Sequence, residues 1–204
     1  MSVIQPRFAI FGAGGNGREL AAVLDARHGG QADIVFVTDD GGPEVAGRPH
    51  LGFDAMKAQA GERLMVVSVA RPDVRRQIVE RCEAAGFGFA EVRAKSCVDY
   101  GADIAEGAVL CDFTLLTVNV RIGRHFHANY YSQVSHDCVI GDFVTFGPGV
   151  RCNGNVTIED EAYIGAGATI RQGLRIGRGA VVGMGAAVVA DVPAGALVKG
   201  VPAR

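Results

Sequence analysis

A period of six residues runs through the second half of this 204-residue chain and limits what it can fold into. Every sixth residue from Val98 to Val188 is aliphatic, aromatic, alanine or cysteine. These anchor positions are Val98, Ile104, Leu110, Leu116, Ile122, Ala128, Val134, Ile140, Phe146, Cys152, Ile158, Ile164, Ile170, Ile176, Val182 and Val188. Such a hexapeptide repeat predicts a parallel β-helix, in which each hexad forms one short strand and one turn while its anchor points inward.

Three hexads complete one coil of the predicted β-helix. The repeat therefore predicts about five coils, each of roughly eighteen residues and stacked ~4.8 Å apart in the hydrogen-bonding direction. The 29 glycines of the chain fit this architecture, because a β-helix needs a tight turn at every corner. We assign residues 96–204 to the β-helix and its C-terminal tail.

Residues 1–95 follow a different pattern, in which strand-like and helix-like segments alternate. Apolar, β-branched runs at 7–12, 33–39 and 63–70 predict strands, and helix-compatible stretches cover 17–27 and 71–86. This alternation predicts parallel strands joined by helical crossovers. The expected fold is therefore a Rossmann-like α/β domain followed by a β-helix.

A glycine-rich loop follows the first predicted strand and opens the first predicted helix. It contains Gly12-x-Gly14-x-x-Gly17, and Asp39 and Asp40 end the next strand. This context is typical of a nucleotide site, where glycines let the backbone approach a phosphate at a helix N-terminus. A nucleotide or nucleotide sugar fits the short domain better than NAD does, and a βα turn without a ligand is the alternative.

Composition excludes several other classes of function. The net charge of −2 gives no reason to expect a nucleic-acid partner, and no apolar run approaches the ~20 residues of a membrane span. Five cysteines without a C-x-x-C pair indicate reduced thiols and neither a disulfide framework nor a zinc site. We expect a cytoplasmic protein without membrane insertion.

His136 is the residue best placed for chemistry. It lies two positions after the anchor Val134, so it should face outward near a corner, and Gly154 should lie directly above it on the next coil. A histidine base with backbone N–H donors one coil away suits acyl transfer. Asp137 can orient the imidazole only if it already belongs to a turn, because consecutive strand residues point to opposite sides.

Two other interpretations of His136 remain open at this point. It could be a solvated surface residue, or it could bind zinc together with His125 and His127, as histidines do in β-helix carbonic anhydrases. Cys138 lies four residues after the anchor and should point inward or into the corner. No nucleophile then stands beside His136, which favours direct attack by the acceptor over an acyl-enzyme.

The chain resembles a known family over essentially its whole length, and four segments carry the resemblance. These are "IFGAGGNGREL", "NYYSQVSHDCVIGDF", "RCNGNVTI" and "VKGVPAR". They are similar to the sugar O- and N-acetyltransferases of the sialic acid O-acetyltransferase group, which includes enzymes acting on UDP-linked bacillosamine and GDP-perosamine. The resemblance implies a left-handed β-helix, a homotrimer with active sites between subunits, acetyl-CoA as co-substrate and no metal.

The resemblance also implies a role for individual residues. The catalytic residues would be His136 as general base, Asp137 and Asn129. The nucleotide sugar would contact Gly14, Gly15, Asn16, Asp39, Asp40 and Ala70, and acetyl-CoA would contact Thr145, Gly154, Ala166 and Met184. Asn16, Ala70 and Thr145 depart from the family pattern, which often has His, Gly and His at these places.

The leading hypothesis is an acetyl-CoA-dependent N-acetyltransferase that acts on a nucleotide-linked amino-deoxy sugar. O-acetylation of a sialic acid or another sugar hydroxyl is the alternative within the same class. A non-catalytic scaffold that binds nucleotide sugars is the alternative from another class. The sequence does not specify the sugar, the acyl group, or whether the nucleotide is UDP, GDP or dTDP.

Overall fold

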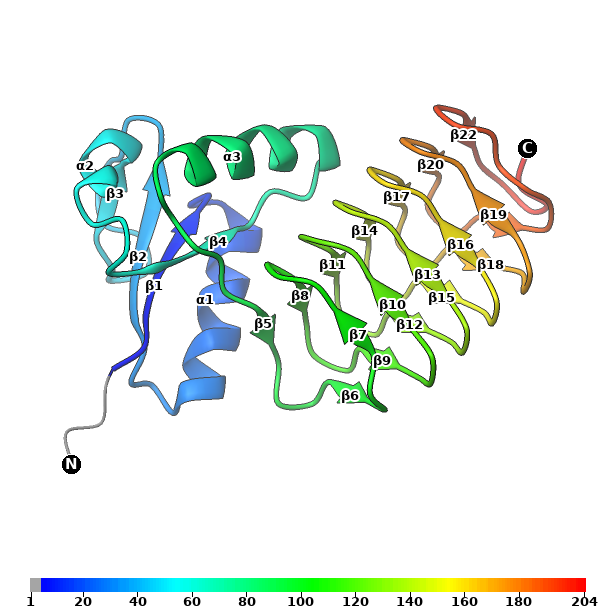
Figure 1. The fold of residues 1–204 in the computed structure, drawn as a ribbon, viewed down its shortest axis with the longest axis horizontal. Helices are drawn as coiled ribbons and strands as arrows, with labels where there is room; N and C mark the ends of the chain where they lie inside the picture. The colour runs from blue at the N-terminus through cyan, green and yellow to red at the C-terminus, as the bar shows by residue number, and fades with distance from the viewer. Residues whose placement is uncertain (1–4) are drawn as a thin grey trace.

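The computed structural model describes residues 5–204 and shows an α/β domain beside the first coils of a parallel β-helix (Figure 1). The α/β domain consists of β1 (Arg7–Phe11), α1 (Gly15–His28), β2 (Asp33–Thr38), β3 (His50–Gly52), α2 (Phe53–Lys57), β4 (Leu64–Val67) and α3 (Pro72–Ala84). Its four strands pair in the order β3-β2-β1-β4, and every pair is parallel. This confirms the predicted parallel sheet, whereas β3 and α2 were not predicted.

The two long helices bury opposite faces of this sheet. Leu20 and Leu24 of α1 join one apolar cluster with Ile10, and Val79 of α3 joins the other with Phe11. The first cluster also includes residues of the β-helix, such as Val92 and Val109. The α/β domain is therefore fastened to the seven-stranded side of the β-helix by a shared core.

The β-helix is built from two-residue strands in three parallel sheets. The seven-stranded sheet holds β5 (Val92–Arg93), β8 (Val109–Leu110), β11 (His127–Ala128), β14 (Thr145–Phe146), β17 (Tyr163–Ile164), β20 (Val181–Val182) and β22 (Leu197–Val198). The six-stranded sheet holds β6 (Val98–Asp99), β9 (Leu115–Leu116), β12 (Gln133–Val134), β15 (Arg151–Cys152), β18 (Thr169–Ile170) and β21 (Ala187–Val188). The five-stranded sheet holds β7 (Asp103–Ile104), β10 (Arg121–Ile122), β13 (Val139–Ile140), β16 (Thr157–Ile158) and β19 (Arg175–Ile176). The predicted hexapeptide β-helix is confirmed.

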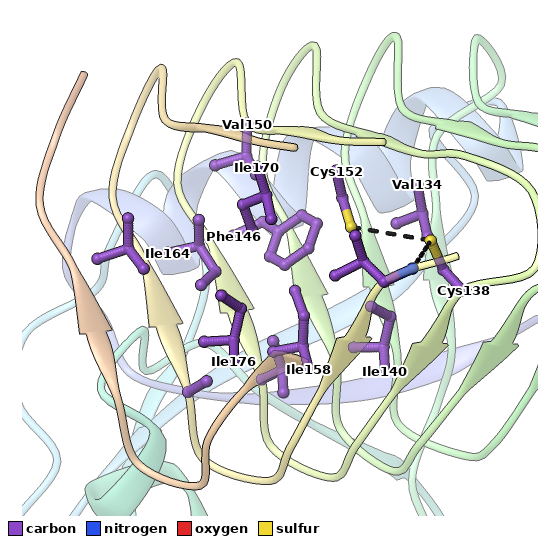
Figure 2. Close-up of a cluster of buried hydrophobic side chains, with 14 of the residues drawn as sticks. Val134, Cys138, Ile140, Phe146, Val150, Cys152, Ile158, Ile164, Ile170 and Ile176 are labelled. Carbon is purple, nitrogen blue, oxygen red and sulfur yellow. Dashed lines mark hydrogen bonds between the residues drawn. The ribbon is translucent and has the colours of Figure 1, made fainter. Parts of the chain in front are cut away.

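The anchors fill the interior of the coils. Anchors from the three sides point toward one another in Figure 2, and the residues from Leu110 to Val188 that anchor each hexad are buried. The thiols of Cys138 and Cys152 meet inside the coil at 3.9 Å, and both side chains are fully buried. Cys138 therefore has the inward position that the repeat predicts.

The first anchor departs from the prediction. Val98 pairs with Leu115 and Asp99 with Leu116, so the first turn of the helix is one residue shorter than the later ones. Val98 is consequently 43% exposed, and Asp99 takes the anchor register. The Asp99 carboxylate binds Arg93 at 2.8 Å instead of entering the core. The pairing itself begins with β5 at residue 92, slightly before the predicted start at 96.

Arg75 of α3 fixes the loop after β4 against the β-helix. Its guanidinium is fully buried and donates to the carbonyls of Val69 (2.8 Å), Ala70 (3.0 Å), His125 (3.1 Å) and Phe143 (2.7 Å). Burial lowers the pKa of Arg75 to about 9, which still leaves it charged at neutral pH. One side chain thus sets the position of the β4–α3 loop relative to β11 and β14.

Candidate active site

His136 lies on an exposed corner of the β-helix, in the turn between β12 and β13. We call this turn and those above and below it the His136 corner; it includes Val118, His136 and Gly154. The His136 side chain is 58% exposed, and its Nδ1 lies 2.8 Å from Oδ2 of Asp137. The outward orientation predicted from the hexad register is therefore observed.

Asp137 meets the condition that its pairing with His136 requires. Its φ of 60° places it in the left-handed region, so the chain turns there and the carboxylate swings back to the imidazole. Asn119, one coil below, donates to the other carboxylate oxygen at 3.1 Å. Hydrogen bonds from His136 and Asn119 hold the pKa of Asp137 below its usual range. An ionised Asp137 keeps Nε2 as the imidazole nitrogen that is free to take a proton.

Gly154 lies against the His136 ring, as the eighteen-residue spacing predicts. A Cβ added to Gly154 would overlap Cε1 and Nε2 of that ring. The φ of Gly154 is not positive, so glycine is required here for space and not for backbone conformation. The neighbouring Asn155 N–H donates to the carbonyl of His136 at 2.8 Å, which ties the two turns together.

A depression of about 640 Å³ opens beside this pair. It is lined by Ser135, His136, Asn153, Gly154, Arg171 and Gln172. These residues offer a base, a glycine backbone and one cationic side chain in an open groove that climbs from one coil to the next. Because its lining residues come from three successive coils, the groove can hold a chain-like acyl donor laid along the β-helix.

The glycine-rich loop forms at the carboxyl edge of the α/β sheet. Gly12 has a φ of 114° and its N–H donates to the Val37 carbonyl at 2.8 Å, while a Cβ on Gly17 would overlap the Gly12 carbonyl. By contrast, a Cβ on Gly14 or Gly15 would meet nothing within 4 Å. The N-cap Gly14 and the first residue of α1, Gly15, therefore face open space, and α1 has no side-chain cap at its N-terminus. Free N–H groups at such a helix end suit a phosphate.

Ser68 at the end of β4 braces this loop, and the sequence patterns did not indicate it. Its hydroxyl donates to the Phe11 carbonyl at 2.9 Å, and its own carbonyl accepts from the Asn16 side chain at 2.5 Å. Asn16 therefore serves the loop itself in this structure. A polar residue at the end of an apolar strand was the available signal.

Asp39 and Asp40 are exposed at the same sheet edge as the loop. Asp39 accepts from Arg81 of α3 at 2.7 Å, and Asp40 forms a short antiparallel bridge with Gly52. Because the carboxyl ends of parallel strands meet at one edge of the sheet, both carboxylates lie at the edge where α1 begins. This arrangement is the one expected for a nucleoside bound across the edge.

A second cavity of about 160 Å³ lies between the α/β domain and the seven-stranded sheet. It is lined by Asn16, Glu19, Ala70, Val109, Cys111, His127, Ala128, Asn129, Thr145 and Phe146. It brings together three predicted substrate or catalytic residues, Asn16, Ala70 and Asn129. We call it the interdomain cavity.

Thr145 also lines the interdomain cavity, although the resemblance assigned it to acetyl-CoA. Its hydroxyl donates to the Ala70 carbonyl at 2.7 Å, and only 4% of the residue is exposed. Ala166 and Met184 lie elsewhere, in turns between the seven- and six-stranded sheets, and Met184 is 80% exposed. One chain alone therefore spreads the four predicted cofactor residues over three separate places.

His136 and the interdomain cavity lie at opposite edges of the six-stranded sheet. Asn129 follows β11 of the seven-stranded sheet, whereas His136 follows β12 on the next side. One side of the coil separates them, and an extended stretch of about four residues at ~3.3 Å each spans roughly 13 Å. Within one chain, Asn129 is thus not brought to His136.

His125 and His127 have environments unlike that of His136. His125 stacks on Phe143 with ring centroids 5.2 Å apart, and burial lowers its pKa to about 3. His127 is buried against the α/β domain, which also lowers its pKa well below the usual range. Across residues 5–204, no three His, Cys, Asp or Glu side chains come together as a metal site would require.

No helix within residues 5–204 combines the length and the apolar character that crossing a bilayer requires.

Comparisons with known proteins agree with the fold. The PglD N-terminal domain model matches residues 7–82, and the model for the hexapeptide repeat of succinyl-transferase matches residues 155–190. GDP-perosamine N-acetyltransferase of Escherichia coli O157:H7 is 41% identical over 213 aligned residues, which cover 97% of this chain and 95% of the relative.

Solved structures give the same result. The acetyltransferase domain of PglB from Neisseria gonorrhoeae FA1090, in complex with acetyl coenzyme A, matches with a TM-score of 0.91 at 32% identity and covers 98% of both chains. PerB from Caulobacter crescentus, in complex with CoA and GDP-perosamine, matches with a TM-score of 0.90 at 26% identity, covering 99% of this chain and 97% of that one.

An α/β domain that leads into a hexapeptide β-helix is the architecture that this chain shares with these acetyltransferases. The chain belongs to the family of PglD-like, acetyl-CoA-dependent sugar N-acetyltransferases that includes the E. coli enzyme. The resemblance noted in the sequence is confirmed.

Proposed function

We propose that this protein transfers the acetyl group of acetyl-CoA to the amino group of a nucleotide-linked amino sugar, with GDP-perosamine as the first candidate. The observation that carries this proposal is the His136–Asp137 pair, whose ring lies over Gly154 beside an open groove. The relatives contribute the substrate class, because one is named for GDP-perosamine and two were solved with CoA or acetyl-CoA.

The reaction is a direct transfer. The sugar amine attacks the thioester carbonyl while Nε2 of His136 takes the amine proton, so a C–N bond forms. The C–S bond then breaks, and the proton passes to the departing thiolate to give CoA-SH. Asp137 stabilises the imidazolium, and the Gly154 N–H serves as a donor to the oxyanion. The fully buried Cys138 takes no part.

The acceptor binds through the α/β domain. The diphosphate lies at the N-terminus of α1 over Gly14 and Gly15, where added Cβ atoms would meet open space. The nucleoside extends toward Asp39 and Asp40 at the strand ends, and the sugar enters the interdomain cavity beside Asn129. Acetyl-CoA runs between two β-helices, past Gly154 of one copy and Ala166 and Met184 of another.

The complete site requires two copies of the chain, because His136 and the interdomain cavity lie on different corners of the β-helix within one copy. Exposed apolar residues mark two different corners of the β-helix: Phe113 and Tyr131 stack at 4.9 Å on one, and Val118 lies on the His136 corner. When two unlike surfaces meet head to tail and the rotation between copies closes, the copies form a ring. We propose a homotrimer with one site at each junction.

The test is a thiol-release assay with acetyl-CoA against a panel of nucleotide amino sugars. We expect turnover with GDP-perosamine or a close analogue, and a loss of roughly a hundredfold or more in kcat for His136→Ala. Asp137→Asn should cost less, since it leaves the base in place. Wild-type turnover by His136→Ala would contradict the assignment, and binding of the sugar nucleotide without thiol release would favour a non-catalytic scaffold.

A further inference from the structure

Glu19 is a charged residue of the interdomain cavity to which neither the sequence patterns nor the reaction above gives a role. It lies on α1 one helical turn after Asn16, so both side chains share the face of the helix that turns toward the cavity. Asn16 is anchored on the Ser68 carbonyl at 2.5 Å, which fixes the orientation of that face. The opposite face of α1 is buried through Leu20 and Leu24.

The Glu19 carboxylate is left without a cationic partner. None of the ion pairs found within residues 5–204 involves it, although most exposed carboxylates of the α/β domain pair with arginine or lysine. It faces the seven-stranded sheet near Cys111 and Tyr130. Burial, Cys111 and then Glu19 raise the pKa of Tyr130 to about 12. Glu19 is exposed in this structure, so water hydrates its carboxylate, and a ligand that enters the cavity must replace that water with donors of its own.

The other cavity groups complement a carboxylate. The Asn129 side-chain oxygen accepts from the Tyr130 N–H at 2.8 Å, so its NH₂ group is the part that can donate into the cavity. Thr145 donates to Ala70 and therefore offers lone pairs. Val109 and Cys111, which belong to the apolar cluster shared with the α/β domain, form an apolar floor. The cavity thus offers one hydrogen-bond donor, acceptors on its rim and an apolar floor. This combination matches the hydroxyl groups and the apolar face of a single deoxy-sugar ring.

We propose that Glu19 is a specificity-determining residue, whose carboxylate accepts hydrogen bonds from the hydroxyl or ammonium donors of the bound sugar ring. This rests on the proposed function, because it assumes that the sugar enters the interdomain cavity. Glu19 selects the sugar, while the helix N-terminus and the strand-end aspartates bind the nucleotide. A sugar that lacks the donors facing Glu19 would leave the carboxylate unpaired and bind poorly.

The test compares Glu19→Gln with wild type for two ligands, GDP and GDP-perosamine, by calorimetry. We expect the affinity for GDP-perosamine to fall roughly tenfold to a hundredfold, as for the loss of a hydrogen bond to a charged group. The affinity for GDP and the KM for acetyl-CoA should stay within about twofold. Glu44→Gln is the matched control, since it removes the same charge from an exposed loop of the same domain.

The outcomes separate this proposal from the proposed function. Unchanged affinity of Glu19→Gln for GDP-perosamine would overturn the role of Glu19, and so would an equal loss of GDP affinity, which would indicate damage to α1. Wild-type binding of GDP-perosamine no tighter than that of GDP would overturn it as well. If the wild type binds GDP-perosamine with the expected Glu19 dependence but releases no thiol from acetyl-CoA, only the acetyltransferase proposal fails.

Discussion

At the scale of single residues, the site depends on one missing Cβ. Gly154 does not have a positive φ, so an alanine there would keep an ordinary backbone conformation. Its methyl group would nevertheless occupy the space that the His136 ring now fills. We expect Gly154→Ala to lower kcat by roughly a hundredfold, because a base displaced by about 1 Å loses its alignment with the attacking amine.

Steady-state kinetics and thermal unfolding would check this prediction together. The KM for the nucleotide sugar should change little, since the α/β domain is untouched. Gly88→Ala is a suitable control, because a Cβ there meets only Leu64 Cδ2 at 3.5 Å. A Gly154→Ala enzyme with normal kcat would mean that the ring position seen here is not the one used in catalysis.

At the scale of elements, aspartate side chains connect successive coils. Asp142 Oδ1 accepts from the Arg124 N–H at 2.8 Å, and Asp160 Oδ1 accepts from the Asp142 N–H at 2.9 Å. A Cβ on Gly123 or Gly141 would overlap these carboxylates. The I-G-D step is thus a structural unit: the glycine leaves room for the aspartate that caps it from the next coil.

This connection predicts a stability effect that is separate from catalysis. Asp160→Ala should lower the free energy of unfolding by about 1.5–3 kcal/mol, the usual range for a lost hydrogen bond to a charged group. Urea denaturation would measure it, with Asp103→Ala as the control on an exposed strand position of the same sheet. kcat should not change, because this corner lies away from His136. Equal stability of the two variants would contradict the role of the cap.

The element scale also shows what the sequence could and could not predict. The hexad period predicted the position of Gly154 over His136, because every coil between them has the full length. It misplaced Val98, because the first coil is one residue short and periodicity carries no information about such a shift. β3 and α2 were missed, since a three-residue strand and a five-residue helix are too short to show a period.

Other site features depended on contacts that no local pattern records. The chain turns at Asp137 because this residue has a positive φ. A positive φ at a residue other than glycine cannot be read from the sequence. Thr145 was assigned to the cofactor by resemblance, and its bond to the Ala70 carbonyl arises only when the β4–α3 loop docks on β14. Glu19 enters the cavity through the same docking. Interdomain packing is the information that a repeat cannot supply.

At the scale of the whole molecule, Arg75 couples the α/β domain to the β-helix. It has no carboxylate partner within residues 5–204, so backbone carbonyls from both domains solvate its charge. Arg75→Met would leave several buried carbonyls unpaired and should destabilise the fold by about 3 kcal/mol or more. Arg75→Lys keeps the charge but cannot reach all these carbonyls at once.

For Arg75→Lys we expect a higher KM for the nucleotide sugar, with the KM for acetyl-CoA and the thermal stability less affected. The reason is that Ala70, on the loop that Arg75 holds, lines the interdomain cavity, whereas the acetyl-CoA groove lies on the β-helix alone. Titration of each substrate against saturating amounts of the other would separate the two KM values. Equal changes in both would show that Arg75 acts on the fold as a whole.

The proposed composite site makes the strongest prediction for the assembly, because it can be tested by mixing two inactive proteins. His136→Ala lacks the proposed base, and Ala70→Trp fills the interdomain cavity. If each site takes its base and its cavity from different copies, co-refolded mixed oligomers should regain activity in about a quarter of their sites. Separately refolded variants provide the background. If both halves instead came from one chain, no mixture could contain an intact site, and activity would stay at background at every mixing ratio.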